Sequence, residues 1–239
     1  MNVAIVLCAG TGSRMNLVIP KQYMNILGNP LISYSLKAFE KAKTVDKIIS
    51  VVGDALVNSL SQKEIIFSIK NKYEISKLSA DDIILGGSNR QQSVFNALNH
   101  ISKMINDDDI VAIHDGVRAL IKPDSIDYII EQTKIFGCTT FAKKATNTLT
   151  KVDEDLLIEQ YVDREKVFEL ETPQCFRFKA IYKSHKKIMV QSNTKITDDT
   201  SIAINNGYKV KIIENKYPNN KLTTRNDIAI FETYLAKSN

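Results

Sequence analysis

The sequence has few cysteines and no long apolar segment. Its longest apolar runs are the length of a strand, whereas a membrane-spanning helix needs roughly 20 apolar residues. The first residues lack the charged region and cleavage site of a secretory signal. The three cysteines, Cys8, Cys138 and Cys175, are far apart and form no C-x-x-C pair. We therefore expect a cytoplasmic protein with reduced thiols, no structural zinc and no membrane partner.

The sequence also lacks internal repeats, low-complexity tracts and flexible linkers. Its 239 residues are 44% hydrophobic and 25% charged, which is typical of a soluble globular protein, and we predict a single domain over residues 1–239. The formal net charge is +5. Because the lysines are scattered, without an Arg-rich helix or an aromatic RNA-binding signature, this charge favours anionic small molecules over nucleic acid as partners.

Apolar β-branched runs alternate with amphipathic segments along most of the chain. The expected strands are residues 2–8, 46–52, 108–115, 138–145 and 208–213, and the expected helices are residues 30–43, 89–105, 123–137, 178–190 and 197–207, with a last helix after residue 224. This alternation predicts an α/β fold, a mostly parallel twisted sheet with helices on both faces. Ligands of such sheets bind beyond the carboxyl ends of the strands. The segments to examine are therefore residues 9–22, 86–90 and 114–118.

The first of these segments combines glycines with cations. Gly10 and Gly12 follow the first expected strand, but they complete neither the G-x-G-x-x-G fingerprint nor the Walker spacing. Arg14 and Lys21 follow them with no acidic residue nearby, and Pro20 stiffens the approach to Lys21. This composition predicts a phosphate clamp. The alternative is a surface loop with two solvated cations.

The second and third segments carry weaker signals. In "GGSNR" the glycines permit close approach, and Ser88 or Asn89 can cap the next helix. In "HDGVR" Asp115 can hold a metal–phosphate complex or a sugar hydroxyl. The alternatives are an ordinary turn before a helix and a turn aspartate paired with Arg118. His114 is expected to be structural.

Residues 147–171 interrupt the alternation. Two short apolar stretches flank the acidic turn "DEDL", which predicts a β-hairpin that stands away from the sheet. Because such a hairpin is marginal alone, we expect a second subunit to pack against it.

Two acids and a lysine near the end of the chain have simple explanations when each is considered alone. In "ITDDTS" Thr197 or Asp198 is expected to cap a helix and Asp199 to lie in its first turn, an explanation that suffices for one acid. Lys221, in "NNKLT", would be interpreted as a surface residue.

Taken together and in order, the motifs carry a resemblance. They are G-x-G-S-R-M, P-K-Q-Y, G-G-x-x-R-x-x-S-V, H-D-G-x-R, V-D-R, T-P-Q-x-F, T-D-D-x-S and N-x-K-x-T, spread over essentially the whole chain. The sequence closely resembles the 2-C-methyl-D-erythritol 4-phosphate cytidylyltransferases of isoprenoid synthesis. A sister family, the ribitol 5-phosphate cytidylyltransferases, shares much of the pattern. The step from Arg14 to Lys21, together with "VDR" and "TDDTS", favours the first family.

The resemblance implies a nucleotidyltransferase fold of Rossmann-like type, as in the nucleotide-diphospho-sugar transferases. It implies transfer from CTP to methylerythritol phosphate, with Mg²⁺ held mainly by the substrate phosphates and Asp115 as a candidate ligand. It also implies a homodimer in which the arm, residues 146–171, serves the neighbouring site. The implied roles are transition-state stabilisation by Arg14 and Lys21, CTP binding by Ala9, Gly10, Gly12, Gly87, Ser88 and Ser93, and acceptor binding by Asp115, Arg118, Thr148, Arg164, Thr172 and Lys221.

The sequence departs from the family pattern at three places. Ala119 stands where the family usually has proline and Asn147 where it usually has aspartate, and the acid that the family commonly has near Ser88 is missing. None of these touches the triphosphate clamp, so CTP use is better supported than the identity of the acceptor. The alternatives are a ribitol phosphate or other polyol phosphate acceptor, and an inactive nucleotide-binding protein with the same fold.

Overall fold

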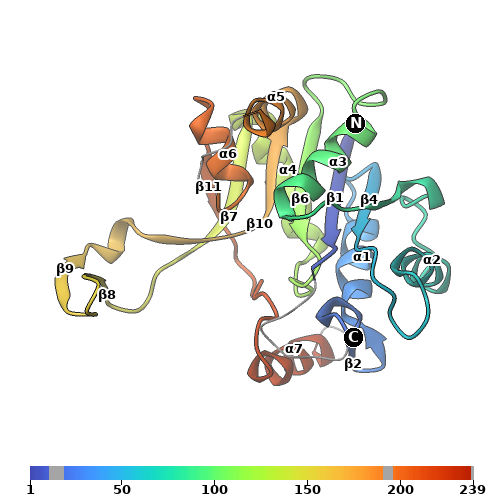
Figure 1. Cartoon of the computed structure of the whole chain (residues 1–239), viewed down its shortest axis with the longest axis horizontal. Helices are drawn as coiled ribbons and strands as arrows, with labels where there is room; N and C mark the ends of the chain where they lie inside the picture. Colours follow the sequence, from blue (N-terminus) through green and yellow to red (C-terminus); the bar gives the residue numbers. More distant parts are fainter. Residues whose placement is uncertain (11–18, 191–195, 238–239) are drawn as a thin grey trace.

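The protein is built around one seven-stranded sheet, with an arm that extends from its body (Figure 1). The computed structural model describes residues 1–10, 19–190 and 196–237. The strands of the large sheet are β1 (Asn2–Cys8), β4 (Lys47–Val52), β5 (Ile83–Leu85), β6 (Ile110–Asp115), β7 (Cys138–Lys144), β10 (Phe168–Arg177) and β11 (Lys211–Glu214). They lie in the order β11-β7-β10-β6-β1-β4-β5.

Most neighbouring strands of this sheet are parallel. Within the part of this sheet that the structure describes, only β10 runs antiparallel to its neighbours, which are β6 and β7. The helices are α1 (Leu31–Lys41), α2 (Gln62–Lys72), α3 (Arg90–Ile101), α4 (Pro123–Phe136), α5 (Phe178–Met189), α6 (Asp199–Asn205) and α7 (Asn226–Ala236). The predicted α/β fold with a mostly parallel sheet is confirmed.

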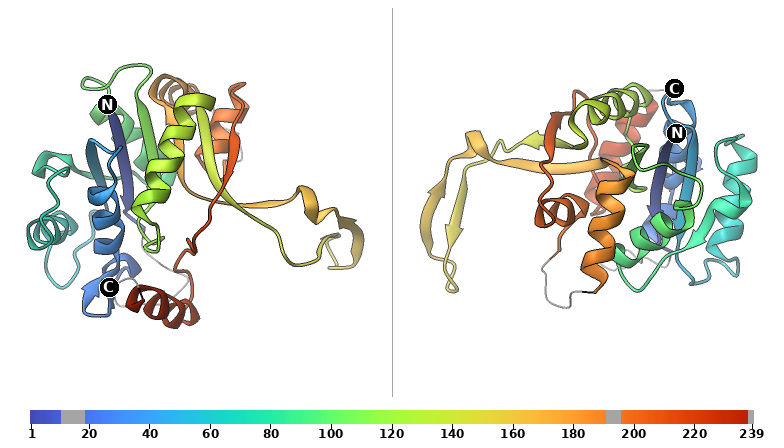
Figure 2. Two further views of the ribbon diagram at one scale, coloured as in Figure 1. Left: turned by 180° about the vertical axis from the view of Figure 1, so that it is seen from behind. Right: turned by 90° about the horizontal axis from the view of Figure 1, so that it is seen from above.

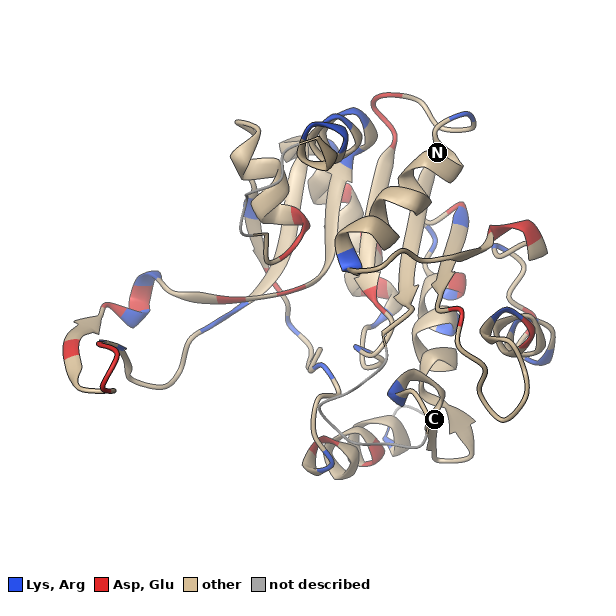
Figure 3. Cartoon of the chain, viewed as in Figure 1, with Lys and Arg blue, Asp and Glu red and all other residues tan. Residues whose placement is uncertain are grey.

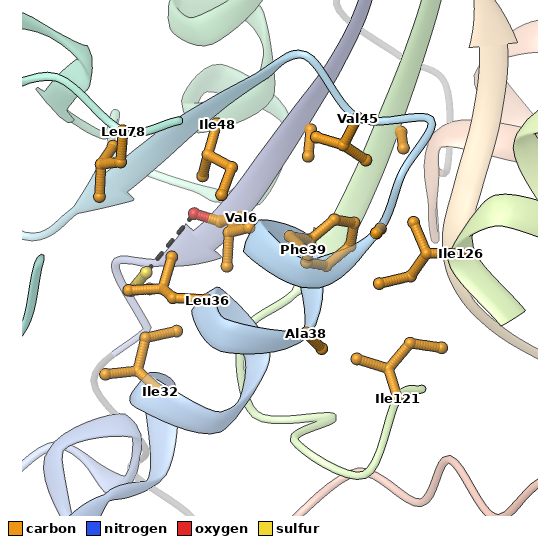
Figure 4. Close-up of a cluster of buried hydrophobic side chains, with 14 of the residues drawn as sticks. Val6, Ile32, Leu36, Ala38, Phe39, Val45, Ile48, Leu78, Ile121 and Ile126 are labelled. Atoms are coloured by element: carbon orange, nitrogen blue, oxygen red, sulfur yellow. Dashed lines mark hydrogen bonds between the residues drawn. The ribbon is translucent and has the colours of Figure 1, made fainter. Parts of the chain in front are cut away.

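Helices cover both faces of the sheet, as Figure 2 shows from two further directions. On one face, α1, α2 and α4 pack their apolar side chains against the strands, with Phe39 of α1 fully buried near Val6 of β1 (Figure 4). On the other face, α3, α5 and α6 form a second core. A third, smaller cluster joins α7 to Leu31 and Ala119. Residue 119, where the family has proline, is thus a packed core position.

Local signals explain several helix ends. Pro123 begins α4, and Gly137 ends it with a φ of 79°, a left-handed conformation that favours glycine. Asp198 is the N-cap of α6, with its side chain accepting from the Ser201 amide. All three ends agree with the sequence-based predictions.

Besides the three-residue strand β5, two elements of the sheet and its helical layers were not among the predicted ranges. The first is α2, which begins with a capping box formed by Ser61 and Glu64 but buries little apolar surface, so its hydrophobic pattern is faint. The second is β10, of which only "TPQCF" lies in the core, while its first half runs out into the arm. Because β10 returns from the arm, it is antiparallel to its neighbours, which strand-by-strand pattern analysis could not foresee.

The predicted hairpin is present. It consists of β8 (Leu149–Val152) and β9 (Ile158–Val162), which pair with each other, followed by the 3-10 turn η4 (Arg164–Lys166). β7 and β10 carry the hairpin away from the body (Figure 1). The remaining short elements are η2 (Lys21–Tyr23), η3 (Ala80–Asp82) and the paired β2 (Asn25–Ile26) and β3 (Asn29–Pro30).

The cysteines and charges of the chain are distributed as follows. Cys8, Cys138 and Cys175 are buried free thiols. Figure 3 shows lysine and arginine spread over several helices and the arm, with acidic residues among them. Within residues 1–10, 19–190 and 196–237, no helix has the length and apolar character that a membrane span requires.

Candidate active site

A cavity of about 370 Å³ lies where β1, β5 and β6 end. Its walls come from segments far apart in the sequence: the residues after β1, the turn before α3, the end of β6 and the chain before α7. The predicted site residues that line it are Ala9, Gly10, Lys21, Gly87, Ser88, Ser93, Asp115 and Lys221. The segments expected at the strand ends therefore line one cavity.

The turn before α3 is held by its own side chains. Asn89 caps α3, because its side chain accepts from the Gln92 amide at 2.8 Å. The Ser93 hydroxyl accepts from the Gly87 amide at 3.0 Å and donates to the Asn89 carbonyl at 2.8 Å. A Cβ at Gly87 would lie 2.0 Å from Gln92 Cγ, so only glycine fits between this turn and the helix. The turn is thus preformed at the cavity wall.

Asp115 is the anionic centre of the cavity. Its Oδ2 accepts from Lys221 Nζ at 2.6 Å, and its Oδ1 lies 3.4 Å from Arg90 Nε. Burial alone would raise the pKa of this carboxyl, but the charges of Arg90, Lys221 and Arg118 outweigh burial and hold the pKa well below its usual value. Asp115 is therefore ionised at neutral pH and is poorly suited to act as a base.

Arg118 contacts backbone rather than pairing with Asp115. Its guanidinium donates to the Asn219 carbonyl at 2.8 Å and to the Leu170 carbonyl at 3.4 Å. The carboxylate of Asp115 bonds to Lys221 and Arg90 instead. The alternative of a simple turn pair between Asp115 and Arg118 is therefore wrong.

Thr172 and His114 lie behind Asp115. The Thr172 hydroxyl accepts from the Asp115 amide at 3.0 Å and lies 3.1 Å from His114 Nδ1. His114 is fully buried, and this burial lowers its pKa to about 3. A neutral, buried histidine supports the strand end, in agreement with its predicted structural role. Thr172 is also buried. Its contact with the acceptor substrate stays a prediction.

Of the two cations of the predicted clamp, Lys21 and Arg14, the structure describes Lys21. Lys21 begins η2, lines the cavity and donates from Nζ to the Leu222 carbonyl at 2.8 Å. Arg14 and Gly12 lie outside the described residues, and their roles stay predictions.

The arm residues lie apart from the cavity of their own chain. Thr148 and Arg164 are exposed, and Arg164 donates to the Thr146 carbonyl at 3.1 Å. Neither residue lines the cavity, and the arm points away from the body (Figure 1). Asn147, one of the three departures, is exposed on the same segment.

A buried carboxylate that the sequence pattern did not reveal lies behind the cavity. Asp199 is fully buried, with Oδ2 2.6 Å from Arg90 Nη1 and Oδ1 3.0 Å from His185 Nε2. This contact explains the second acid of "ITDDTS", since Asp198 alone serves as the cap. The signal was the surplus acid itself, but its partners, 109 and 14 residues away, could not be read from the pattern.

Comparisons with known proteins identify the family of this chain. The family model described as "IspD: 2-C-methyl-D-erythritol 4-phosphate cytidylyltransferase" matches residues 2–237. This chain belongs to the IspD family. Proteins named 2-C-methyl-D-erythritol 4-phosphate cytidylyltransferase from Clostridium novyi and Clostridium acetobutylicum are 37% and 35% identical to it. The alignments cover 98% and 100% of this chain and 96% and 99% of the relatives.

Solved structures of the IspD family share the fold. The 4-diphosphocytidyl-2C-methyl-D-erythritol synthase of Anaerococcus prevotii has a TM-score of 0.81 at 26% identity, covering 99% of this chain and 98% of that one. The 2-C-methyl-D-erythritol 4-phosphate cytidylyltransferase of Francisella tularensis has a TM-score of 0.75 at 26% identity, covering 98% of this chain and 99% of that one. The resemblance noted from the motifs, including its Rossmann-like nucleotidyltransferase fold, is thus confirmed.

Proposed function

We propose that this enzyme converts CTP and 2-C-methyl-D-erythritol 4-phosphate to 4-diphosphocytidyl-2-C-methyl-D-erythritol and pyrophosphate in isoprenoid synthesis. IspD family membership supports the reaction, and the observation that carries it is the grouping of Lys21, Asp115 and Lys221 around one cavity at the strand ends. A phosphate oxygen of the acceptor bonds to the α-phosphorus of CTP. The bond from that phosphorus to the bridging oxygen breaks, and pyrophosphate leaves with its electron pair.

The cations supply the catalysis in this proposal. Negative charge must be held on both sides of the transferring phosphorus, and fixed cations achieve this by position and electrostatics without a covalent intermediate. We assign Lys21 and Arg14 to the triphosphate. Removing one such donor costs about 3 kcal/mol of transition-state stabilisation.

The nucleotide is assigned to the side of the cavity formed by the first loop and the turn before α3. Its proposed contacts are Ala9, Gly10, Gly12, Gly87, Ser88 and Ser93. Support comes from the preformed turn, in which Ser93 fixes the Gly87 amide at the wall. Ser88 lines the same wall without the acid common in the family, so its hydroxyl is the group available to a ribose.

The acceptor is assigned to the other side of the cavity. Asp115, Arg118, Thr172 and Lys221 are its proposed contacts from the body, with Lys221 holding the phosphate. Lys221 is already oriented there by its bond to Asp115. Thr148 and Arg164 are assigned to the partner's site in a homodimer. Support comes from the arm's exposed apolar side chains, including Leu156 at 79% and Leu157 at 65% exposure, which a second subunit would cover.

Mg²⁺ is the proposed cofactor, and the site fits an ion bound mostly by the substrate. Within the described ranges, no group of three or more acidic, histidine or cysteine side chains could form a protein cage for a metal. Mg²⁺ commonly keeps waters and binds through one or two carboxylates plus substrate phosphates. Asp115 is the candidate ligand, because its Oδ1 has only a long contact with Arg90. The ion would neutralise charge on the triphosphate.

The reaction is tested by pyrophosphate release from CTP and Mg²⁺, with methylerythritol 4-phosphate and ribitol 5-phosphate in parallel. Turnover on the first acceptor alone is the expected result. Preference for ribitol phosphate would assign the chain to polyol phosphate activation instead, and no turnover on either would favour a nucleotide-binding protein. We also propose a cytoplasmic location, which the three free, buried thiols support.

A further inference from the structure

A buried amide lies beneath the first loop of the site. Gln22 follows Lys21 in η2, and it is 1% exposed. Its Nε2 donates to the Cys8 carbonyl at 2.5 Å and to the Gly10 carbonyl at 2.8 Å. Because a carboxamide nitrogen has two hydrogens, one side chain satisfies two carbonyls of the cavity loop at once.

The carbonyls of Cys8 and Gly10 lie where the neighbouring strands no longer supply hydrogen-bond donors to the chain. The pairing of β1 with β6 ends at Leu7, and its pairing with β4 ends at Cys8. Cys8 is buried, whereas Gly10 is exposed. A buried backbone carbonyl without a donor is costly, so the chain at Cys8 would otherwise turn to find one. Gln22 supplies both hydrogen bonds and thereby sets the path of residues 8–10.

The direction of these bonds matters for the cavity. In a trans peptide the N–H points opposite to the carbonyl of the same unit. With the Cys8 carbonyl directed at Gln22, the Ala9 N–H is directed away from Gln22, and Ala9 and Gly10 both line the cavity. The Cys8 carbonyl is thus paired with Gln22 and is not a free acceptor at the wall that Ala9, Gly10 and Gln22 itself line.

Gln22 also links this loop to the catalytic lysine. Lys21 is its neighbour in the same turn, and Lys21 Nζ donates to the Leu222 carbonyl, one residue after Lys221. We propose that Gln22 is a positioning residue for CTP, which fixes the start of the nucleotide loop relative to Lys21. This inference rests on the proposed cytidylyl transfer, and it assigns a role to the third residue of the P-K-Q-Y motif.

Tyr23 provides a matched control in the same turn. It is also buried, but its hydroxyl donates to Gln62 Oε1 at 3.0 Å, and Gln62 accepts from the Gly53 amide at 2.9 Å. Tyr23→Phe therefore removes a buried hydrogen bond from η2 without touching the carbonyls of residues 8 and 10. Gln22→Met keeps the length of the side chain and removes both donors.

The test measures kcat and KM for CTP and for the acceptor, CTP affinity without acceptor, and the melting temperature of each variant. We expect Gln22→Met to lower kcat/KM for CTP by roughly tenfold to a hundredfold, because small displacements of a reacting group have costs of that order. The acceptor KM should stay within about twofold. Tyr23→Phe should keep the wild-type kcat/KM for CTP even if it lowers the melting temperature as much as Gln22→Met does.

Several results would overturn the positioning role. These are an unchanged kcat/KM for CTP in Gln22→Met, a loss expressed in the acceptor KM, or an equal loss in Tyr23→Phe. If Gln22→Met does not fold, Gln22→Asn keeps the amide but shortens its reach, and the same comparison applies. An inactive wild-type enzyme would instead count against the proposed function, which separates the two failures.

Discussion

Lys221 and Asp115 form an ion pair of 2.6 Å across 106 residues of sequence. The lysine side chain is 32% exposed and the aspartate 13%, so the pair lies at the cavity wall with one side open to a ligand. This contact joins the chain before α7 to the end of β6. It holds the lysine at the cavity wall without burying its charge, and we propose that an acceptor phosphate binds there.

Replacing this lysine should weaken binding of the acceptor. In Lys221→Met the aliphatic length is kept while the phosphate contact is lost, so we expect the acceptor KM to rise about tenfold or more, the equivalent of roughly 1.4 kcal/mol. Steady-state kinetics with saturating CTP measures this effect. Lys63→Met, an exposed lysine of α2, is the control. An unchanged acceptor KM in Lys221→Met would remove Lys221 from the phosphate site.

Lys21 should act on turnover more than on nucleotide binding. Its cation is assigned to the charge that develops at the triphosphate, so Lys21→Ala should lower kcat about a hundredfold or more. CTP affinity, measured by calorimetry without acceptor, should change far less. If kcat stays within about threefold of the wild type, the transition-state role is wrong.

The arm should make the enzyme a dimer. Leu157 and Ile158 are 65% and 60% exposed in the single chain, and we expect a partner subunit to cover them. The wild type should sediment as a dimer, and the double change Leu157→Asp with Ile158→Asp should dissociate it, because charges at a buried contact are costly. A fully active wild-type monomer would contradict the shared site.

A mixing experiment tests which subunit the arm serves. Arg164→Ala and Lys221→Ala should each be impaired as homodimers. In a mixed dimer, one site combines the intact Lys221 of one chain with the intact Arg164 of the other. If the chains exchange freely, half of the dimers are mixed with one intact site each, so about a quarter of wild-type activity should return. No recovery in mixed dimers purified with two different tags would place Arg164 in its own chain's site.

The sequence predicted five strands of the large sheet and six helices, because buried β-branched runs and capped amphipathic helices are local patterns. It missed α2, whose apolar pattern is faint, and β5, which has only three residues. It also predicted the hairpin, whose apolar stretches flank an acidic turn. It could not predict β10 as an antiparallel strand, since its neighbours are set by the return of the arm. The grouping of Lys221 with Asp115 followed from the family resemblance, because nothing local to "NNKLT" indicates a partner 106 residues away.

The partners of Asp199, the buried acid behind the cavity, likewise could not be predicted from the local sequence. Its charge predicts that the stability of the fold depends on pH. Burial alone would raise the pKa of Asp199, but the charge of Arg90 and the hydrogen bond from His185 outweigh burial and lower it. A carboxyl with a lowered folded pKa stabilises the fold above its unfolded pKa, about 3.9, and this contribution is lost as pH falls through the folded value. Asp199→Asn should therefore destabilise the protein near neutral pH, by about 3 kcal/mol, because it leaves Arg90 without its closest partner.

The stability difference between wild type and Asp199→Asn should shrink as the pH is lowered below about 4, because the carboxyl of the unfolded chain is protonated there while the folded one still holds its charge. The shrinkage ends once the pH has passed the lowered folded pKa. Urea unfolding at a series of pH values measures this difference. Asp227→Asn is a suitable control. Asp227 is a capping carboxylate that accepts from the amides of Thr223 and Thr224 before α7, so its loss should leave Arg90 and the cavity undisturbed. A difference that stays constant down to acid pH would mean that Asp199 contributes through packing and not through its charge.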